Sequence, residues 1–184
     1  MSMHEGIRGY LKKPIVCFLL VLFITVCSGC SYEAYKEYFT EVTSYSEIWE
    51  LPGMRGGVEN GDSIFPRDIS GLNVEMFFCR YDEQLPIGEG IQIFVQVRYD
   101  DIEGFRNEKQ RLQTKYNNCD AYFNVEGYSF KSSNLSESGF LEYAAIYEKE
   151  QTVIYVYLQD LPYEEIEFDE KFIPSGYTGY GDLN

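Results

Sequence analysis

Histidine is almost missing from this chain of 184 residues. The single histidine, His4, lies near the start, so residues 5–184 contain no imidazole. A Ser-His-Asp or Cys-His mechanism needs histidine as its general base, and histidine is the commonest ligand of catalytic zinc. Residues 5–184 by themselves therefore cannot carry out a large share of hydrolase mechanisms.

Positive charge is also scarce. The chain has 15 Lys and Arg residues against 30 Asp and Glu residues, which gives a formal net charge of −15. Such a surface repels the phosphates of nucleic acids, anionic lipids and acidic wall polymers. We expect no nucleic-acid partner and, because like-charged copies repel one another, a soluble monomer.

Long hydrophobic runs are absent except near the N-terminus. An apolar run spans 15–26, basic residues at positions 8, 12 and 13 precede it, and Ser28-Gly29-Cys30 closes it. A basic stub, a short apolar core and small residues at a cut site are typical of a secretory signal peptide. From Pro14 to Gly29 is 16 residues, short of the roughly 20 that span a bilayer core.

The stretch Val26-Cys27-Ser28-Gly29-Cys30 resembles the lipobox of bacterial lipoprotein signals. In that family the cysteine after the cut receives lipid and becomes the first residue of the mature protein. The resemblance implies a signal peptide over 1–29 and a lipid on Cys30, which would anchor the rest on the outer face of the cytoplasmic membrane. Cys27 departs from the leucine that is usual at its position. Plain secretion and an uncleaved anchor are the alternatives.

Removal of residues 1–29 changes both the charge and the number of thiols. Those residues hold three of the 15 basic residues and one of the 30 acidic ones, so a formal charge of −17 remains. Besides Cys30, only Cys79 and Cys119 are left. In an extracytoplasmic domain, two thiols make a disulfide one candidate, and two small buried side chains the other.

Patterns of apolar residues predict five strands and one helix. Alternation predicts strands at 72–81, 91–99 and 121–130. Two further strands are predicted at 140–147 and at the strongly β-prone stretch 152–158. Asp100 and Glu103 have capping-box spacing, and an apolar stripe after them predicts a helix over 100–118. The short connection between the first two strands favours a hairpin.

The predicted fold class is α+β, in the order β-β-α-β-β-β. It is an antiparallel sheet of about five strands with one helix on a face. Because one helix covers only part of such a sheet, the terminal segments must cover the other face, or it is wet. We place a lipid-anchored tether and loop at 30–62, the α+β domain at 63–175 and a flexible tail at 176–184.

Carboxylates are abundant, with 30 Asp and Glu residues in the chain. The acidic cluster at 164–170 lacks the ligand spacing of a calcium loop, and we interpret it as a solvated face. Paired carboxylates serve glycoside hydrolysis, which keeps a small histidine-free, wall-active enzyme as an alternative. No nucleophile elbow, P-loop or dinucleotide motif occurs. We expect no catalytic residue, no cofactor and no metal.

Tyrosine is the one residue type in excess, with 17 in the chain. Tyr143, Tyr147, Tyr155 and Tyr157 fall on the last two predicted strands. One interpretation is an exposed aromatic surface that binds glycan or peptide. The other is a set of cross-strand pairs on a half-covered sheet.

Between Ile64 and Asp160 lie the stretches FPRDIS, FFCRYD, IQIFVQVRYDD, and EYAAIYE before TVIYVYLQD. Together they resemble small uncharacterised lipoproteins of Gram-positive bacteria. The resemblance implies an exported, membrane-anchored α+β domain and no particular activity. The sequence therefore predicts a non-enzymatic lipoprotein that binds a protein or envelope component.

Overall fold

The computed structural model describes residues 35–55, 63–84, 88–135, 139–179 and 182–183. They belong to one compact unit, Ala34–Asn184. The predicted signal peptide and Cys30 lie outside the described residues. Within the described ranges, no helix combines the length and the apolar character that crossing a membrane requires.

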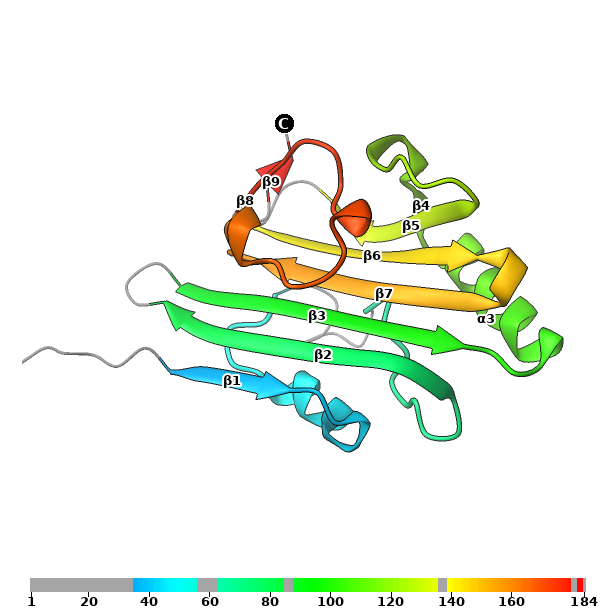
Figure 1. The fold of residues 1–184 in the computed structure, drawn as a ribbon, viewed down its shortest axis with the longest axis horizontal. Helices are drawn as coiled ribbons and strands as arrows, with labels where there is room; N and C mark the ends of the chain where they lie inside the picture. Colours follow the sequence, from blue (N-terminus) through cyan, green and yellow to red (C-terminus); the bar gives the residue numbers. More distant parts are fainter. Residues whose placement is uncertain (1–34, 56–62, 85–87, 136–138, 180–181, 184) are drawn as a thin grey trace, which may run out of the picture. The chain divides into compact units, whose positions relative to one another are not determined.

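Seven antiparallel strands form the main sheet (Figure 1). In chain order they are β1 (Lys36–Phe39), β2 (Asn73–Gln84), β3 (Gly88–Arg98), β4 (Asn117–Asn118), β5 (Tyr128–Asn134), β6 (Phe140–Tyr147) and β7 (Thr152–Gln159). Their order across the sheet is β1-β2-β3-β7-β6-β5-β4. The fold is α+β, as predicted, with seven strands in place of about five. The two additional strands, β1 and β4, are short and form the two edges.

The middle of the sheet follows from the apolar pattern. Strands β2 and β3 pair as an antiparallel hairpin, which confirms the predicted connection. All eight residues of β7 are buried. A strand that is apolar on both faces needs cover on both sides, and β7 lies between β3 and β6 with a layer on each face.

The strand predicted at 121–130 is wrong for most of its length. Residues Asp120–Tyr122 form a 3-10 turn, η2, and β5 begins only at Tyr128. The Asp120 carboxylate accepts a hydrogen bond from the Phe130 amide and thereby holds the turn against the strand. Phe123 stacks on Phe130 with their ring centroids 3.8 Å apart. Phe123 and Val125 therefore pack on the sheet instead of joining it.

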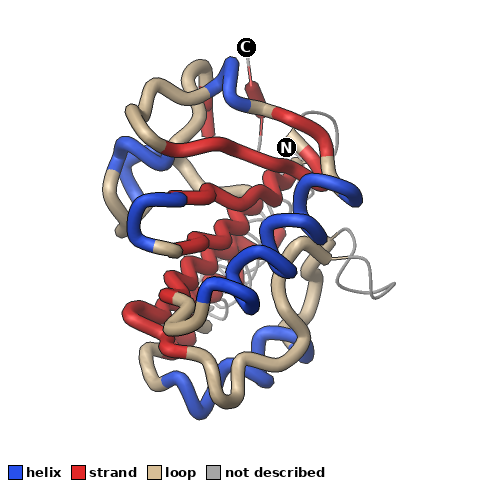
Figure 2. Tube along the Cα trace, turned by 90° about the vertical axis from the view of Figure 1, so that its right-hand side faces the viewer, coloured by secondary structure: helices blue, strands red, loops and turns tan. Residues whose placement is uncertain are grey.

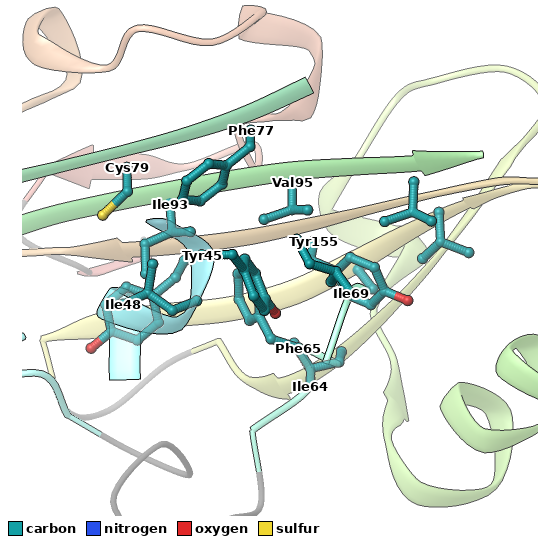
Figure 3. Close-up of a cluster of buried hydrophobic side chains, with 14 of the residues drawn as sticks. Tyr45, Ile48, Ile64, Phe65, Ile69, Phe77, Cys79, Ile93, Val95 and Tyr155 are labelled. Carbon is teal, nitrogen blue, oxygen red and sulfur yellow. The ribbon is translucent and has the colours of Figure 1, made fainter. Parts of the chain in front are cut away.

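One face of the sheet, the α3 face, is covered by the helix α3 (Ile102–Lys115), by the 3-10 helix η1 (Val42–Glu50) and by residues 63–69. Asp101 caps α3 by accepting from the Gly104 amide at 2.7 Å, one residue after the predicted cap. Figure 2 shows α3 running across one side of the sheet. Figure 3 shows strand side chains meeting side chains of the covering segments, namely Phe77, Ile93, Val95 and Tyr155 against Tyr45, Ile48, Ile64, Phe65 and Ile69.

The other face, the C-terminal face, is covered by residues 119–125 and 160–179. Two short 3-10 turns, η4 (Tyr163–Glu165) and η5 (Glu170–Phe172), lie in this segment, and β8 (Tyr177–Gly179) pairs with β9 (Asp182–Leu183). Phe172, Ile173 and Tyr177 are buried against strands β5 to β7. The predicted flexible tail at 176–184 is thus wrong at least for Tyr177, whose hydroxyl donates to the Leu161 carbonyl at 2.7 Å.

The folded domain also begins earlier than predicted. The predicted tether and loop at 30–62 include residues 35–55, but β1 pairs with β2 and both Tyr45 and Ile48 of η1 are buried. The polar composition of 31–43 favours a tether over a strand. An edge strand can nevertheless be largely polar, because only part of its surface is buried. No more than four residues, 31–34, separate Cys30 from the described fold.

Candidate functional site

The four tyrosines of the last two predicted strands do not form a common exposed surface. Tyr143, Tyr155 and Tyr157 are fully buried, and Tyr147 is half-buried. Tyr155 and Tyr157 belong to the core of the α3 face, whereas Tyr143 belongs to that of the C-terminal face. The sheet lies between Tyr143 on one face and Tyr155 and Tyr157 on the other. The predicted exposed aromatic surface is therefore wrong, because these three tyrosines are core residues.

Burial also changes the acidity of the three buried tyrosine hydroxyls. Desolvation raises the pKa of Tyr143 and Tyr155 well above the ordinary value, and also raises that of Tyr157. Each hydroxyl has a partner inside the protein. Tyr143 donates to the Phe172 carbonyl at 2.5 Å, and Tyr155 donates to Glu108 at 2.5 Å. These groups therefore stabilise the fold and do not offer hydroxyls to a ligand.

Cys79 and Cys119 do not form a disulfide. Both thiols are free and buried. Cys79 lies in the core of the α3 face and Cys119 in that of the C-terminal face. Four strand positions separate β2 from β5, which bonds Cys119, or about 19 Å at 4.8 Å per strand. A disulfide needs Cα atoms within about 7 Å. Of the two candidates, the structure supports the small buried side chains.

The acidic cluster at 164–170 is only partly a solvated face. Arg80 on β2 has a side chain 7% exposed, and its guanidinium contacts Glu165 Oε2 at 2.5 Å and Glu167 Oε1 at 2.9 Å. It also contacts the buried Asp82. Two acids of the cluster thus attach the C-terminal segment to the sheet. Among the described residues, no group of His, Cys, Asp and Glu side chains is arranged to hold a metal ion.

A cavity of about 310 Å³ lies where α3 ends and β4, β5 and β6 meet. We call it the Glu142 cavity. It is lined by Lys115, Tyr116, Asn117, Ser132, Ser133, Asn134, Phe140 and Glu142. Its volume falls at the lower end of the roughly 300–1,000 Å³ of ligand pockets. Seven of the eight side chains carry a hydrogen-bonding group, and the eighth is an aromatic ring.

Glu142 is the most unusual side chain of this cavity, because it is 1% exposed in an otherwise apolar strand. Its Oε1 accepts from the Ser63 hydroxyl and from the Ile64 amide at 3.2 Å, and its Oε2 accepts from the Ser133 hydroxyl. Burial raises the pKa of the Glu142 carboxyl, although these hydrogen bonds and the Lys115 charge oppose the shift. Buried ionisable groups with shifted pKa values are enriched at functional sites.

A β-bulge helps to build the cavity. The register of β5 against β6 shifts between Ser132 and Asn134. A bulge places an extra residue on one strand and redirects its side chains. Here Ser132, Ser133 and Asn134 all line the cavity, which strict alternation along a strand would not allow. Asn134 also donates from its amide to the Phe140 carbonyl at 2.9 Å.

A second cavity of about 340 Å³ lies between η1 and residues 67–70. Its only carboxylate, Asp68, is exposed and already accepts from the amide and hydroxyl of Ser70. The Glu142 cavity has slightly less volume but contains the buried carboxyl and two amide side chains. We therefore regard the Glu142 cavity as the candidate site. Neither of these two cavities is lined by a pair of carboxylates.

Sequence reasoning missed the cavity because its polar residues were assigned to a helix end and to a loop. One signal in the sequence could have found it. Glu142 occupies an inward position between apolar neighbours in FLEYAAIY, where a carboxylate needs partners. Comparison with protein-family models, with curated proteins and with solved structures gave no match.

Proposed function

We propose that this protein is a lipid-anchored binding protein on the outer face of the cytoplasmic membrane, and that the Glu142 cavity holds one sugar unit of an envelope glycan. The lipid would be attached to Cys30 after removal of residues 1–29. The lipobox-like residues support the anchor, and the cavity supports the binding role. No catalytic step is part of this proposal.

The observation that carries the binding role is the combination of polar groups in the cavity. Asn117 and Asn134 supply amides that donate and accept, and Ser132 and Ser133 supply hydroxyls. Phe140 adds one aromatic ring. A neutral ligand with many hydroxyl groups and one apolar face matches such a lining, since specific sites combine a few placed polar groups with aromatic contact. The cavity size suits one small unit of a longer polymer.

The charge of the domain supports a neutral ligand. With a formal charge of −17 outside residues 1–29, the domain repels anionic polymers. Within the cavity, the ammonium of Lys115 and the carboxyl of Glu142 are the only ionisable groups besides the Tyr116 phenol. A ligand with a net charge would meet one of them unfavourably, whereas a neutral sugar is repelled by neither.

The alternative function, a histidine-free wall-active enzyme, has one supporting observation, the raised pKa of Glu142. A general acid needs such a shift. Glycoside hydrolysis also needs a second carboxyl about 5 to 9.5 Å away across the scissile bond, and the Glu142 cavity is lined by one carboxylate alone. Both Glu142 oxygens are also occupied by protein donors. We therefore prefer binding.

The binding role is tested with N-acetylglucosamine as the probe. Saturation-transfer NMR on the detergent-solubilised full-length protein should show transfer to the sugar. Asn117→Ala removes an exposed amide from the cavity and should abolish the transfer. Asn118→Ala is the matched control, because Asn118 follows on the same strand, is equally exposed and is not part of the lining. Equal signals in both variants, or no signal in the wild type, would contradict the assigned ligand class.

The anchor is tested separately by mass spectrometry of the protein from membrane fractions of growing cells. We expect a product that begins at Cys30 and carries lipid. A palmitate analogue should label the wild type and leave Cys30→Ala unlabelled. A product that begins at Met1, or one that is still labelled after Cys30→Ala, would overturn the anchor.

A further inference from the structure

The first described residue is already part of the sheet. The Tyr35 carbonyl accepts from the Glu83 amide at 2.8 Å, and Lys36 opens β1 directly afterwards. Five residues lead from Cys30 to Tyr35, and a fully extended chain spans at most about 18 Å over that length. If Cys30 carries the lipid, as proposed above, the start of β1 must lie within about this distance of the membrane surface.

Two tyrosines at the β1 edge of the sheet are unusually exposed for large aromatic side chains. Tyr35 is 52% exposed and Tyr38 is 51% exposed, and they are among the most exposed large hydrophobic side chains of the described residues. Their rings meet Tyr81 and Phe78 respectively, so they extend from the two faces of β1. Among the described strands, none pairs with the outer side of β1.

We propose that the β1 edge, defined by Tyr35, Lys36 and Tyr38, lies against the lipid bilayer at the level of the headgroups. Tyrosine is enriched at membrane–water interfaces, because its ring is apolar and its hydroxyl is polar. The unpaired backbone groups of an edge strand cannot enter the hydrocarbon core without partners. At the headgroup level, water and headgroups satisfy them. The contact is therefore shallow.

Charge also limits the depth of this contact. Glu37 on β1 and Glu83 on β2 lie near the same end, and the whole domain is acidic. They repel anionic headgroups over about one Debye length, roughly 8 to 10 Å in physiological salt. The short connection to the lipid keeps the edge near the surface despite this repulsion. The tyrosines contribute orientation, and the lipid supplies the attachment.

This orientation determines how far from the membrane the Glu142 cavity lies. The edge strands β1 and β4 are six strand spacings apart, or about 29 Å. Asn117 of β4 and the serines of β5 line the cavity, so it lies on the side of the sheet remote from β1 (Figure 1). A domain oriented with β1 against the bilayer places the cavity on the side away from the membrane, where envelope glycans can reach it.

The test uses an environment-sensitive thiol-reactive fluorophore on the lipidated protein that begins at Cys30, in phosphatidylcholine vesicles that contain a headgroup-nitroxide lipid. Cys79 and Cys119 are buried, and burial raises the pKa of both thiols, so they should stay unlabelled in the folded protein. Lipid occupies the Cys30 sulfur. The label therefore reports on one introduced cysteine, in Tyr38→Cys or in the control Tyr122→Cys. Tyr122 is 40% exposed and lies in η2 next to β4 and β5.

We expect the nitroxide lipid to quench the label several-fold more strongly in Tyr38→Cys than in Tyr122→Cys. Mass spectrometry of the same samples shows whether Cys30 carries lipid. Lipidated protein with equal quenching at the two positions would overturn the β1 contact and leave the proposed anchor in place. Protein without lipid on Cys30 would overturn both. An unquenched label accompanied by a dimer in the vesicles would assign β1 to a second copy and overturn the membrane contact.

Discussion

At the scale of single residues, the tyrosine excess has a structural explanation. Buried tyrosine rings fill the two cores, and their hydroxyls donate to backbone carbonyls of segments that cover the sheet. These pairs are Tyr45 with Pro66, Tyr116 with Ser63, Tyr143 with Phe172, Tyr157 with Arg55, and Tyr177 with Leu161. The covering segments have little regular structure, so their carbonyls need such donors. Phenylalanine would fill the same space without satisfying them.

Tyr143→Phe tests this role. The change leaves the buried Phe172 carbonyl without its donor, and we expect the free energy of unfolding to fall by about 1 to 3 kcal/mol. Tyr122→Phe, at an exposed site, is the control and should change it by no more than about 0.5 kcal/mol. Urea denaturation with unchanged m-values measures both. Equal midpoints for Tyr143→Phe and the wild type would show that the hydroxyl contributes nothing.

The raised pKa of Glu142 predicts how the stability of the protein changes with pH. Its pKa in the folded protein lies above the ordinary value of 4.5, because burial disfavours the ionised form. Below pH 4.5 the carboxyl is protonated in both states, and its contribution to stability is fully present. As pH rises through the folded pKa, that contribution is lost, since the unfolded chain binds fewer protons.

Glu142→Gln removes this titration and keeps the shape of the side chain. We expect the stability of the variant relative to the wild type to increase as pH rises from below 4.5 toward neutrality. Denaturant unfolding at a series of pH values measures the difference. Glu103→Gln, on the exposed side of α3, is the control and should show a much smaller trend. A constant difference for Glu142→Gln across this range would mean that its pKa is not raised.

At the scale of elements, one arginine makes the ion pairs that help attach the C-terminal segment to the sheet. Arg80 contacts Asp82 on its own strand and both Glu165 and Glu167 on the segment. Gln92 adds neutral hydrogen bonds to the same segment, through the Glu165 carbonyl and the Glu167 amide, each at 2.9 Å. The planar guanidinium can serve several acceptors at once, which an ammonium group cannot do in the same geometry.

Arg80→Met should destabilise the protein strongly. It leaves the Asp82 side chain, 2% exposed, with Lys36 at 3.4 Å as its remaining ion-pair partner among the described residues. Removing one partner of a buried ion pair lowers the free energy of unfolding by about 3 to 5 kcal/mol. Arg98→Met is the control, because Arg98 is 53% exposed and its 3.6 Å contact with Glu75 lies at the surface. Such a pair contributes about 0 to 1 kcal/mol.

Limited proteolysis adds a local measurement to the Arg80 comparison. In Arg80→Met we expect the first cuts within 161–170, because the segment has lost its charged attachment. In Arg98→Met the cutting pattern should match that of the wild type. Identical unfolding curves and identical cuts in the two variants would contradict an anchoring role for Arg80.

At the scale of the whole molecule, both faces of the sheet are covered, each by its own set of segments. The α3 face carries η1, residues 63–69 and α3, whereas the C-terminal face carries 119–125 and 160–179. The central strand β7 contributes to both cores. Its burial is complete only when the last 20 or so residues of the described chain are in place.

A chain that ends at Gln159 should therefore fail to fold. It would expose Phe94, Leu141 and Leu158, an apolar patch that favours aggregation. We expect insoluble protein, or soluble protein that binds ANS and unfolds without a cooperative transition. A chain that ends at Gly179 keeps the covering segment and should unfold cooperatively. Normal cooperative unfolding of the shorter chain would show that the C-terminal face does not need its cover.

Prediction from the sequence succeeded where one element carries its own signal. The β2–β3 hairpin and α3 follow from apolar periodicity, and β6 and β7 follow from runs of apolar, β-prone residues. Together these elements give the α+β class. Prediction failed for β1, β4 and β5, whose polar residues pair only because a neighbouring strand offers an edge. The candidate site was missed for the same reason, since Asn117, Ser132 and Glu142 come from three elements.

The sequence by itself determined the lack of histidine outside the first residues, the acidic charge and the strands with strong periodicity, because these depend on composition or on neighbours along the chain. Only the tertiary structure decided that tyrosines are buried, that Cys79 and Cys119 lie on opposite faces, and that 35–55 belongs to the fold. These outcomes depend on which segments meet across the sheet. Contacts between distant segments are set by packing and hydrogen bonding in three dimensions, which local patterns do not encode.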